Sequence, residues 1–283
     1  NRSRHRHMTS FQVISLGFLS VILLGSLLLM LPIATKSGQC TSFLDALFTS
    51  TSAVCVTGLV INDTATYWSL FGQGIILLLI QIGGMGIITI AIAIAVISGR
   101  KIGLMQRSTM QEAISAPTVG GIVRRTQFII RITILIEIIG AALLAPVFCR
   151  DFGFWKGIWY SLFHSISAFC NAGFDLIGIR TPFSSLTSYS VQPIVNLVIM
   201  ALIVAGGIGF LTWEDIKIHK WHFKKYRMQS KVIFMVTGLL IFLPALYFFC
   251  FEFSNVPLTE RVWVSLFQSV TPRTAGFNTP DLT

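Results

Sequence analysis

Charged residues are scarce in this sequence. They make up 11% of the 283 residues, whereas a soluble domain carries about 25%. Hydrophobic residues reach 54%, and the mean hydropathy is +0.77. Too few charges remain to solvate a water-exposed surface, which excludes the soluble, secreted, disordered and collagen-like classes. Lipid is therefore expected to cover most of the exterior, and we predict an all-α polytopic membrane protein.

Cysteine is also scarce and shows no regular spacing. The five cysteines form no CxxC pair and no His-Cys ligand pattern, so neither a zinc site nor a full disulfide framework is indicated. The apolar segments carry no nucleophile–base pair and no cluster of metal-ligating residues. An enzyme is accordingly not expected.

Long apolar runs are what the sequence does contain. A bilayer core about 30 Å thick requires about 20 apolar residues in a helix. The stretches that meet this requirement are roughly 11–34, 71–98, 127–149, 191–213 and 232–251. A shorter apolar piece of about 10 to 14 residues follows the first, third and fifth of them, and that length is typical of a re-entrant half-helix.

The cations of the chain are distributed unevenly. Of 21 Lys and Arg residues, most precede the first expected span or lie in the segments 99–131 and 217–231. The positive-inside rule places these segments and the N-terminus in the cytoplasm of a multi-pass plasma-membrane protein, with the short apolar pieces entering from outside. We interpret the net charge of +10 as this topology signal and expect no nucleic-acid partner.

The three short pieces resemble one another. They read SFLDALFTSTSAVCVTGLVINDT from Ser42, GIWYSLFHSISAFCNAGFDL from Gly157 and RVWVSLFQSVTPRTAGFNTPDL from Arg261. The glycines that they share are Gly58, Gly173 and Gly276. A second signature recurs in the following spans, QIGGMGIIT and VAGGIGFLT, where close helix packing and a pore role are both open readings. The predicted unit is a span, a half-helix with a glycine turn, and a second span.

Irregular backbone at membrane depth favours a water-lined path for a cation. Unsatisfied polar groups there cost several kcal/mol unless they face water or protein. Glycine allows the carbonyls of CVTG, CNAG and RTAG to turn toward one axis, where carbonyl rings can replace the hydration shell of K+. The C-terminal ends of the half-helices carry partial negative charge, which also favours a cation.

A few ionisable residues near the turns admit two readings. Arg273 is either a structural strut behind the turn or a charge near the pore. Asp45, Asp63 and Asp175 would attract cations to an outer vestibule, but ordinary loop acids are an equal alternative. Glu137 is expected to be a buried acid bonded to another helix or part of the ion path. His164 lies within a half-helix and is expected to form a hydrogen bond to a neighbouring residue.

These motifs resemble the superfamily of Trk, Ktr and plant HKT potassium transporters, most closely the Ktr-type pore-forming membrane subunit. The resemblance rests on AVCVTGL, SAFCNAGF, TPRTAGFN, both glycine-rich spans and the segment GRKIGLMQRSTMQEAISAPTVGG. It implies potassium uptake with some passage of Na+, and it implies four repeated units around one pseudo-fourfold cation pore. It further implies a homodimer regulated by a cytosolic nucleotide-binding RCK ring, and K+ as the bound and transported ion without an organic cofactor.

The resemblance also implies which residues form the selectivity filter. The backbone of these residues would bind the ion: Cys55, Val56, Thr57, Gly58, Cys170, Asn171, Ala172, Gly173, Arg273, Thr274, Ala275 and Gly276. In the plant branch a Ser in place of the first filter glycine is associated with Na+ preference. Gly58 is retained here, so K+ is the expected ion.

The expected organisation follows from these units. It comprises a first pore unit 1–98, a cytoplasmic linker helix 99–126, a second pore unit 127–216, a basic cytoplasmic linker 217–231 and an incomplete third unit 232–283. Compared with the family, the chain is expected to be truncated within the third of four units. The alternatives are a Na+/K+ pathway of low selectivity and a non-conducting membrane scaffold that docks a cytosolic partner. The basic cytoplasmic segments are compatible with such a partner and equally with anionic lipid.

Overall fold

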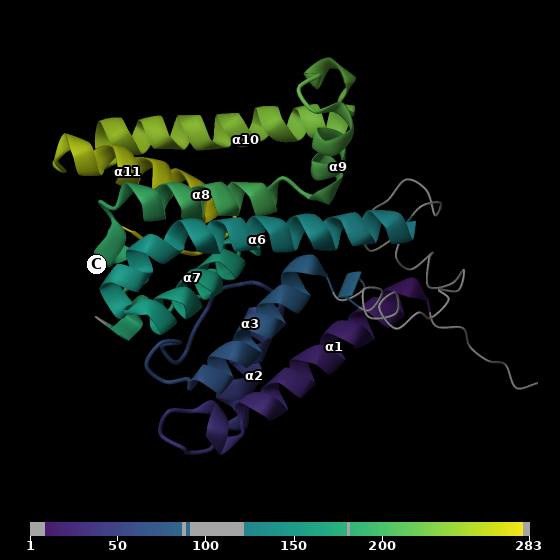
Figure 1. Ribbon diagram of the computed structural model, residues 1–283, viewed down its shortest axis with the longest axis vertical. Coiled ribbons are helices and arrows are strands. Elements are labelled where there is room, and N and C mark those ends of the chain that lie inside the picture. Colours follow the sequence, from purple (N-terminus) through teal and green to yellow (C-terminus); the bar gives the residue numbers. More distant parts are fainter. Residues whose placement is uncertain (1–8, 87–88, 91–121, 180–181, 280–283) are drawn as a thin grey trace, which may run out of the picture.

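The computed structural model describes residues 9–86, 89–90, 122–179 and 182–279, and the regular elements in these ranges are helices (Figure 1). Among them, three are long and apolar enough to cross a membrane. They are α1 (Ser10–Leu29), α6 (Ile122–Phe152) and α10 (Met228–Tyr247), the last extended by a π-helical turn. They coincide with the spans expected at 11–34, 127–149 and 232–251.

Helix α1 illustrates why these segments are stable helices with an apolar exterior. Thr9 and Gln12 form a capping box, in which each side chain accepts a hydrogen bond from the other residue's amide. Leu16 and Leu24 are 52% and 61% exposed. Outward-facing leucines on a helix of this length are expected where lipid, rather than water, is the surrounding solvent.

Each long helix is followed by a short helix that does not reach across the bilayer. These short helices are α2 (Phe43–Val54), α7 (Phe154–Phe169) and α11 (Leu258–Val270), with 12, 16 and 13 residues. At 1.5 Å per residue they reach about 18–24 Å, less than the hydrocarbon thickness of about 30 Å. Each packs against the long helix that precedes it, so α2 lies on α1, α7 on α6 and α11 on α10.

Two further helices, which we call the inner helices, follow the first two short ones. Helix α3 (Leu70–Met85) packs on α2, and α8 (Pro193–Gly207) packs on α7. The straight span expected at 191–213 is wrong in one respect, because α8 and α9 (Phe210–His219) meet at an angle of 95°. Gly209 has a φ of +80° at this break, an angle that residues with a Cβ avoid.

The first inner span shows the same kind of ending. Gly86 caps α3 with a φ of +80°. Most of the remainder of the span expected at 71–98, and most of the expected linker helix 99–126, lie outside the described residues. Helix α6 nevertheless begins at Ile122, before the expected boundary at 127.

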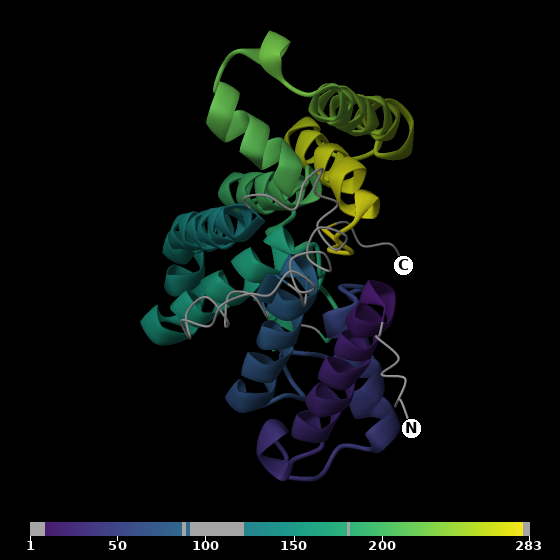
Figure 2. The ribbon, with the colours of Figure 1, turned by 90° about the vertical axis from the view of Figure 1, so that its right-hand side faces the viewer.

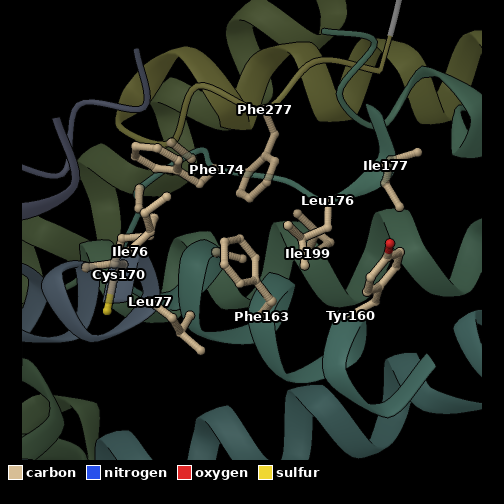
Figure 3. Packing of buried hydrophobic residues seen from close by; sticks show 14 of the residues in the cluster. Ile76, Leu77, Tyr160, Phe163, Cys170, Phe174, Leu176, Ile177, Ile199 and Phe277 are labelled. Carbon is tan, nitrogen blue, oxygen red and sulfur yellow. The ribbon is translucent and has the colours of Figure 1, made fainter. Parts of the chain in front are cut away.

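The helices form successive groups along the long axis of the molecule. Figures 1 and 2 show α1–α3, then α6–α8, then α10–α11 following one another. Helix α3 contacts α7, and α8 contacts α11, so the inner helix of one group meets the short helix of the next. Buried side chains of all three groups belong to one hydrophobic cluster, which includes Leu77, Phe163 and Phe277 (Figure 3).

Candidate functional site

The turns that follow α2, α7 and α11 meet at their glycines. A Cβ placed on Gly58 would lie 2.5 Å from the carbonyl oxygen of Ala172, and one on Gly173 would overlap the carbonyl oxygen of Ala275. A Cβ on Gly276 would lie 4.0 Å from a carbonyl oxygen of the first turn. The three turns therefore approach a common point with backbone against backbone.

The backbone of these turns adopts angles that most residues avoid. The φ angles are +57° and +75° at Val56 and Gly58, and +59° and +72° at Asn171 and Gly173. In the third turn, Gly276 has a φ of +71°. A left-handed φ at a β-branched residue such as Val56 costs about 1–3 kcal/mol and persists only where the surrounding structure holds it.

Hydrogen bonds to the short helices hold the turns in place. The amides of Thr57, Ala172 and Ala275 donate to the carbonyls of Ser52, Ser167 and Thr271 at 2.9, 2.7 and 3.0 Å. The hydroxyls of Ser167 and Thr271 donate to the carbonyls of Phe174 and Phe277 at 2.7 and 2.5 Å. The amides thus point back toward the helices, and each turn is anchored from behind.

The predicted filter residues differ in how their side chains are placed. Cys170, Ala172 and Gly173 are buried, whereas Cys55 and Thr57 are exposed. The second turn is therefore the most enclosed, since it lies between the other two. The structure brings the glycines and the neighbouring carbonyls together, but it does not bring all of the side chains to the same point.

The side chain of Arg273 is directed away from the other turns. Its guanidinium donates a hydrogen bond to the hydroxyl of Thr237 on α10, at 3.2 Å. Thr237 is buried and belongs to the long helix that carries α11. This geometry is that of a strut behind the turn, one of the two readings of the sequence.

One set of residues at this site was missed in the sequence. In each short helix the serine two positions after the Leu-Phe pair donates its hydroxyl to a carbonyl of the preceding long helix. The bonds are Ser50 to Ile22 at 2.8 Å, Ser165 to Glu137 at 2.7 Å and Ser269 to Ile241 at 2.5 Å. The recurrence of LFxS in the three segments was the signal that could have identified them.

The glycine-rich signatures have a packing role. A Cβ on Gly83 would overlap the carbonyl oxygen of Val54, and one on Gly206 would overlap that of Phe169. Both carbonyls belong to the last residue of a short helix. The inner helices can therefore lie directly against the ends of α2 and α7.

Glu137 lies buried behind the second turn. Its carboxylate accepts two hydrogen bonds from the amide of Gln81 on α3, at 2.9 and 3.1 Å. The sulfur of Cys170 lies 4.0 Å from the same carboxylate. Glu137 is thus bonded to another helix, as one reading of the sequence expected, and it joins the first and second groups of helices.

His164 supports the segment that follows the second turn. Its Nδ1 lies 2.7 Å from the carbonyl oxygen of Tyr160, and its Nε2 accepts a hydrogen bond from the amide of Leu176 at 3.3 Å. This pair of contacts requires a neutral ring with the proton on Nδ1. Within the described residues, no group of three or more His, Cys, Asp or Glu side chains could hold a metal ion.

Asp63 connects the loops that follow the first two turns. Its carboxylate accepts hydrogen bonds from the amide and hydroxyl of Thr66, at 2.8 and 2.9 Å, and from the amide of Phe183 at 3.0 Å. A Cβ on Gly178 would overlap this carboxylate. Asp63 is therefore a buried clamp, which favours a structural role over that of a vestibule charge.

We expect Asp175 to make stability fall as pH rises toward neutrality. Burial and the nearby Asp63 raise the pKa of this carboxyl group, which lies outside the spanning helices, from 3.8 to about 6. The folded state then holds a proton that the unfolded state has lost, so stability declines between about pH 4 and pH 6. Asp175→Asn keeps an acceptor for the amide of Ile177 and should lessen this decline.

The measurement is the Tm of the two proteins in detergent at pH 4.5 and pH 7. The difference between them isolates Asp175 from the other titrating groups. Parallel pH dependences in the two proteins would contradict the assignment.

The chain is similar to known proteins along its whole length. A sequence model of the TrkH family, described as a cation transport protein, matches residues 1–283. The chain is 41% identical, over 98% of its length, to the potassium/sodium uptake protein NtpJ of Enterococcus hirae. It is 42% identical, over 95% of its length, to the Ktr system potassium uptake protein B of Bacillus subtilis. It covers 61% and 60% of these two relatives.

The fold is similar to that of a solved structure. The crystal structure of the potassium transporter TrkH from Vibrio parahaemolyticus matches with a TM-score of 0.64 at 22% identity. The match covers 99% of this chain and 54% of that protein. At this identity the likeness concerns the fold alone.

Proposed function

Because the chain belongs to the TrkH family of cation transport proteins, we propose that it contributes the ion-selecting part of a potassium uptake pathway. The family is one of cation transporters rather than enzymes. In this proposal the chain is a polytopic membrane protein, and the predicted filter residues bind K+ through their backbone carbonyls. The repeated units 1–98, 127–216 and 232–283 would surround one pore.

The observation that supports this proposal is the convergence of the three glycine turns. Each turn lies at the C-terminal end of a short helix, where the helix dipole concentrates negative potential. The amides of the turns bond back to those helices, which leaves the carbonyls as the groups available to an ion. Carbonyl oxygens in this arrangement can replace the water molecules around K+.

The identity of the ion is proposed from two sources. The Bacillus relative is named a potassium uptake protein, and the Enterococcus relative a potassium/sodium uptake protein. Gly58 is present at the position where the resemblance associates Ser with Na+ preference. We propose K+ as the preferred ion, with the less selective Na+/K+ pathway as the second candidate because of the name of the Enterococcus relative.

Topology and partners complete the proposal. The distribution of cations supports a cytoplasmic N-terminus and cytoplasmic linkers at 99–126 and 217–231. The Bacillus relative is named as part of a Ktr system. We propose that this chain likewise works with a cytosolic regulatory subunit, an RCK ring, and as a homodimer.

Substitution of Gly58 by serine should lower the preference for K+ over Na+. The added Cβ would lie 2.5 Å from the carbonyl oxygen of Ala172, at a residue whose φ is +75°. If the whole strain of about 1–3 kcal/mol acted on K+ binding and none on Na+ binding, the K+/Na+ preference would fall about 5- to 150-fold, which is the upper limit of the effect. The measurement is 86Rb+ uptake by the full-length gene product in proteoliposomes, with K+ and Na+ as competitors.

Gly238→Ser is the matched control, because a Cβ at Gly238 meets no atom within 4 Å. It should leave uptake and the competition ratio unchanged. If Gly58→Ser also left both unchanged, the filter assignment would be wrong. Absence of uptake by the parent protein, with its regulatory subunit supplied, would support the scaffold alternative.

A further inference from the structure

The connection between α9 and α10 protrudes at one end of the molecule (Figures 1 and 2). We call residues 220–225 the basic-aromatic loop. Trp221 is 88% exposed, and Phe223 is 57% exposed. Met228, the first residue of α10, is 76% exposed. Large apolar side chains therefore project outward just before a membrane-crossing helix begins.

The same loop carries unpaired positive charge. Lys220, Lys224 and Lys225 are exposed, and none of them has an ion-pair partner among the described residues. The acids nearest in sequence, Glu214 and Asp215, are engaged by arginines instead. The loop thus presents three lysine ammonium groups together with two aromatic rings.

The loop is held in one conformation by a buried tyrosine. The hydroxyl of Tyr226 donates to the carbonyl oxygen of Lys220 at 2.5 Å, which closes the loop at its base. The ring of Tyr226 packs against Phe223 and Phe234, with centroids 5.2 and 6.1 Å apart. The exposed lysines and Trp221 are therefore displayed on a preorganised support.

We propose that the basic-aromatic loop binds the headgroups of anionic phospholipids. Its position before Met228 places it at the boundary of the bilayer, because α10 with its extension is a continuous apolar span over Met228–Glu252. Tryptophan favours the headgroup region, where its apolar ring and polar N–H are both accommodated. Lysines next to a span are attracted to anionic lipid.

The aromatic rings distinguish this partner from other anionic ones. A nucleic acid or an acidic protein in the cytosol would also be attracted by the lysines. The loop, however, is held at the membrane surface, because the apolar helix that follows it must begin in lipid. A membrane surface engages the rings and the ammonium groups at once. This inference requires only that α10 spans the bilayer and is independent of the proposed conduction.

The test measures how strongly brominated lipids quench the tryptophan fluorescence of the full-length protein in nanodiscs. Brominated phosphatidylglycerol or brominated phosphatidylcholine is added at an equal fraction to a phosphatidylcholine background. We expect stronger quenching by the brominated anionic lipid, and we expect Trp221→Phe to abolish this excess. Trp155→Phe is the matched control, because Trp155 is 82% exposed at the beginning of α7 and outside the loop.

A second variant tests the role of charge. Replacing Lys220, Lys224 and Lys225 with glutamine should weaken the anionic-lipid preference on the order of 100-fold. Replacement of the exposed Lys156 should leave that preference unchanged. Equal quenching by both brominated lipids would overturn the proposal in favour of a general interfacial position. An excess that survives Trp221→Phe or the lysine variant would also overturn it.

Discussion

Replacement of Gly173 by alanine is expected to reduce 86Rb+ uptake nearly to background. The new Cβ would overlap the carbonyl oxygen of Ala275, and Gly173 has a φ of +72°. The backbone strain alone is about 1–3 kcal/mol, equivalent to about 5- to 150-fold, and the overlap adds to it. Gly173 lies in the most enclosed turn, so relief by a simple outward movement is blocked on both sides.

The uptake assay needs a control for folding. Gly207→Ala is suitable, because Gly207 is the last residue of α8 in the same group of helices and a Cβ there meets nothing within 4 Å. Both variants should be recovered in equal amounts and elute as the parent protein does in size-exclusion chromatography. Uptake by a well-folded Gly173→Ala protein at the parental rate would refute the proposed role of the turn.

Replacement of Asp215 by alanine is expected to destabilise the protein by about 1–3 kcal/mol, because buried hydrogen-bond donors lose their acceptor. Asp215 is 1% exposed, and its carboxylate lies 3.3 Å from the guanidinium of Arg227. It also accepts hydrogen bonds from the amide of Arg227 at 3.1 Å and from the hydroxyl of Ser230 at 2.6 Å. Alanine would leave these donors without a partner at the start of α10, where a negative charge also favours the helix dipole.

The measurement is the Tm in detergent, compared with that of Asp215→Asn. Both hydrogen bonds end on the same carboxylate oxygen, so asparagine can keep that acceptor while it removes the charge. Its Tm should therefore lie between those of the parent and the alanine variant. Asp45→Ala is a further reference, since Asp45 lies in the first turn of α2 and is less deeply buried. If Asp215→Ala and Asp45→Ala lowered the Tm equally, the contacts of Asp215 with Arg227 and Ser230 would not be a main source of stability.

Much of the architecture could be predicted from hydropathy and from short motifs. The spans that became α1, α6 and α10 were recognisable because lipid demands an apolar run of a certain length. The family resemblance rested on the glycine motifs and is confirmed by the family match over residues 1–283. The filter assignment, the unit boundaries and the truncation stay predictions.

Other features were beyond prediction because they depend on residues far apart in the chain. Glu137 could be identified as a buried acid, but its partner Gln81 is 56 positions away. Asp63 was interpreted equally well as a vestibule charge, and only the contact with Phe183, 120 positions away, showed that it is a clamp. Helix propensity could not locate the bend at Gly209, because the three glycines of VAGGIGFLT are also compatible with a straight, closely packed helix.

The sequence by itself determined that this protein is a membrane protein of the TrkH family, and where its apolar helices and glycine turns lie. Hydrophobicity and backbone freedom are local properties, so the order of residues is enough to specify them. The tertiary structure decided which turns meet, which serines fasten the short helices, and where the buried acids find their donors. Those outcomes depend on the distance between atoms of separate helices, and that distance exists only once the helices have packed.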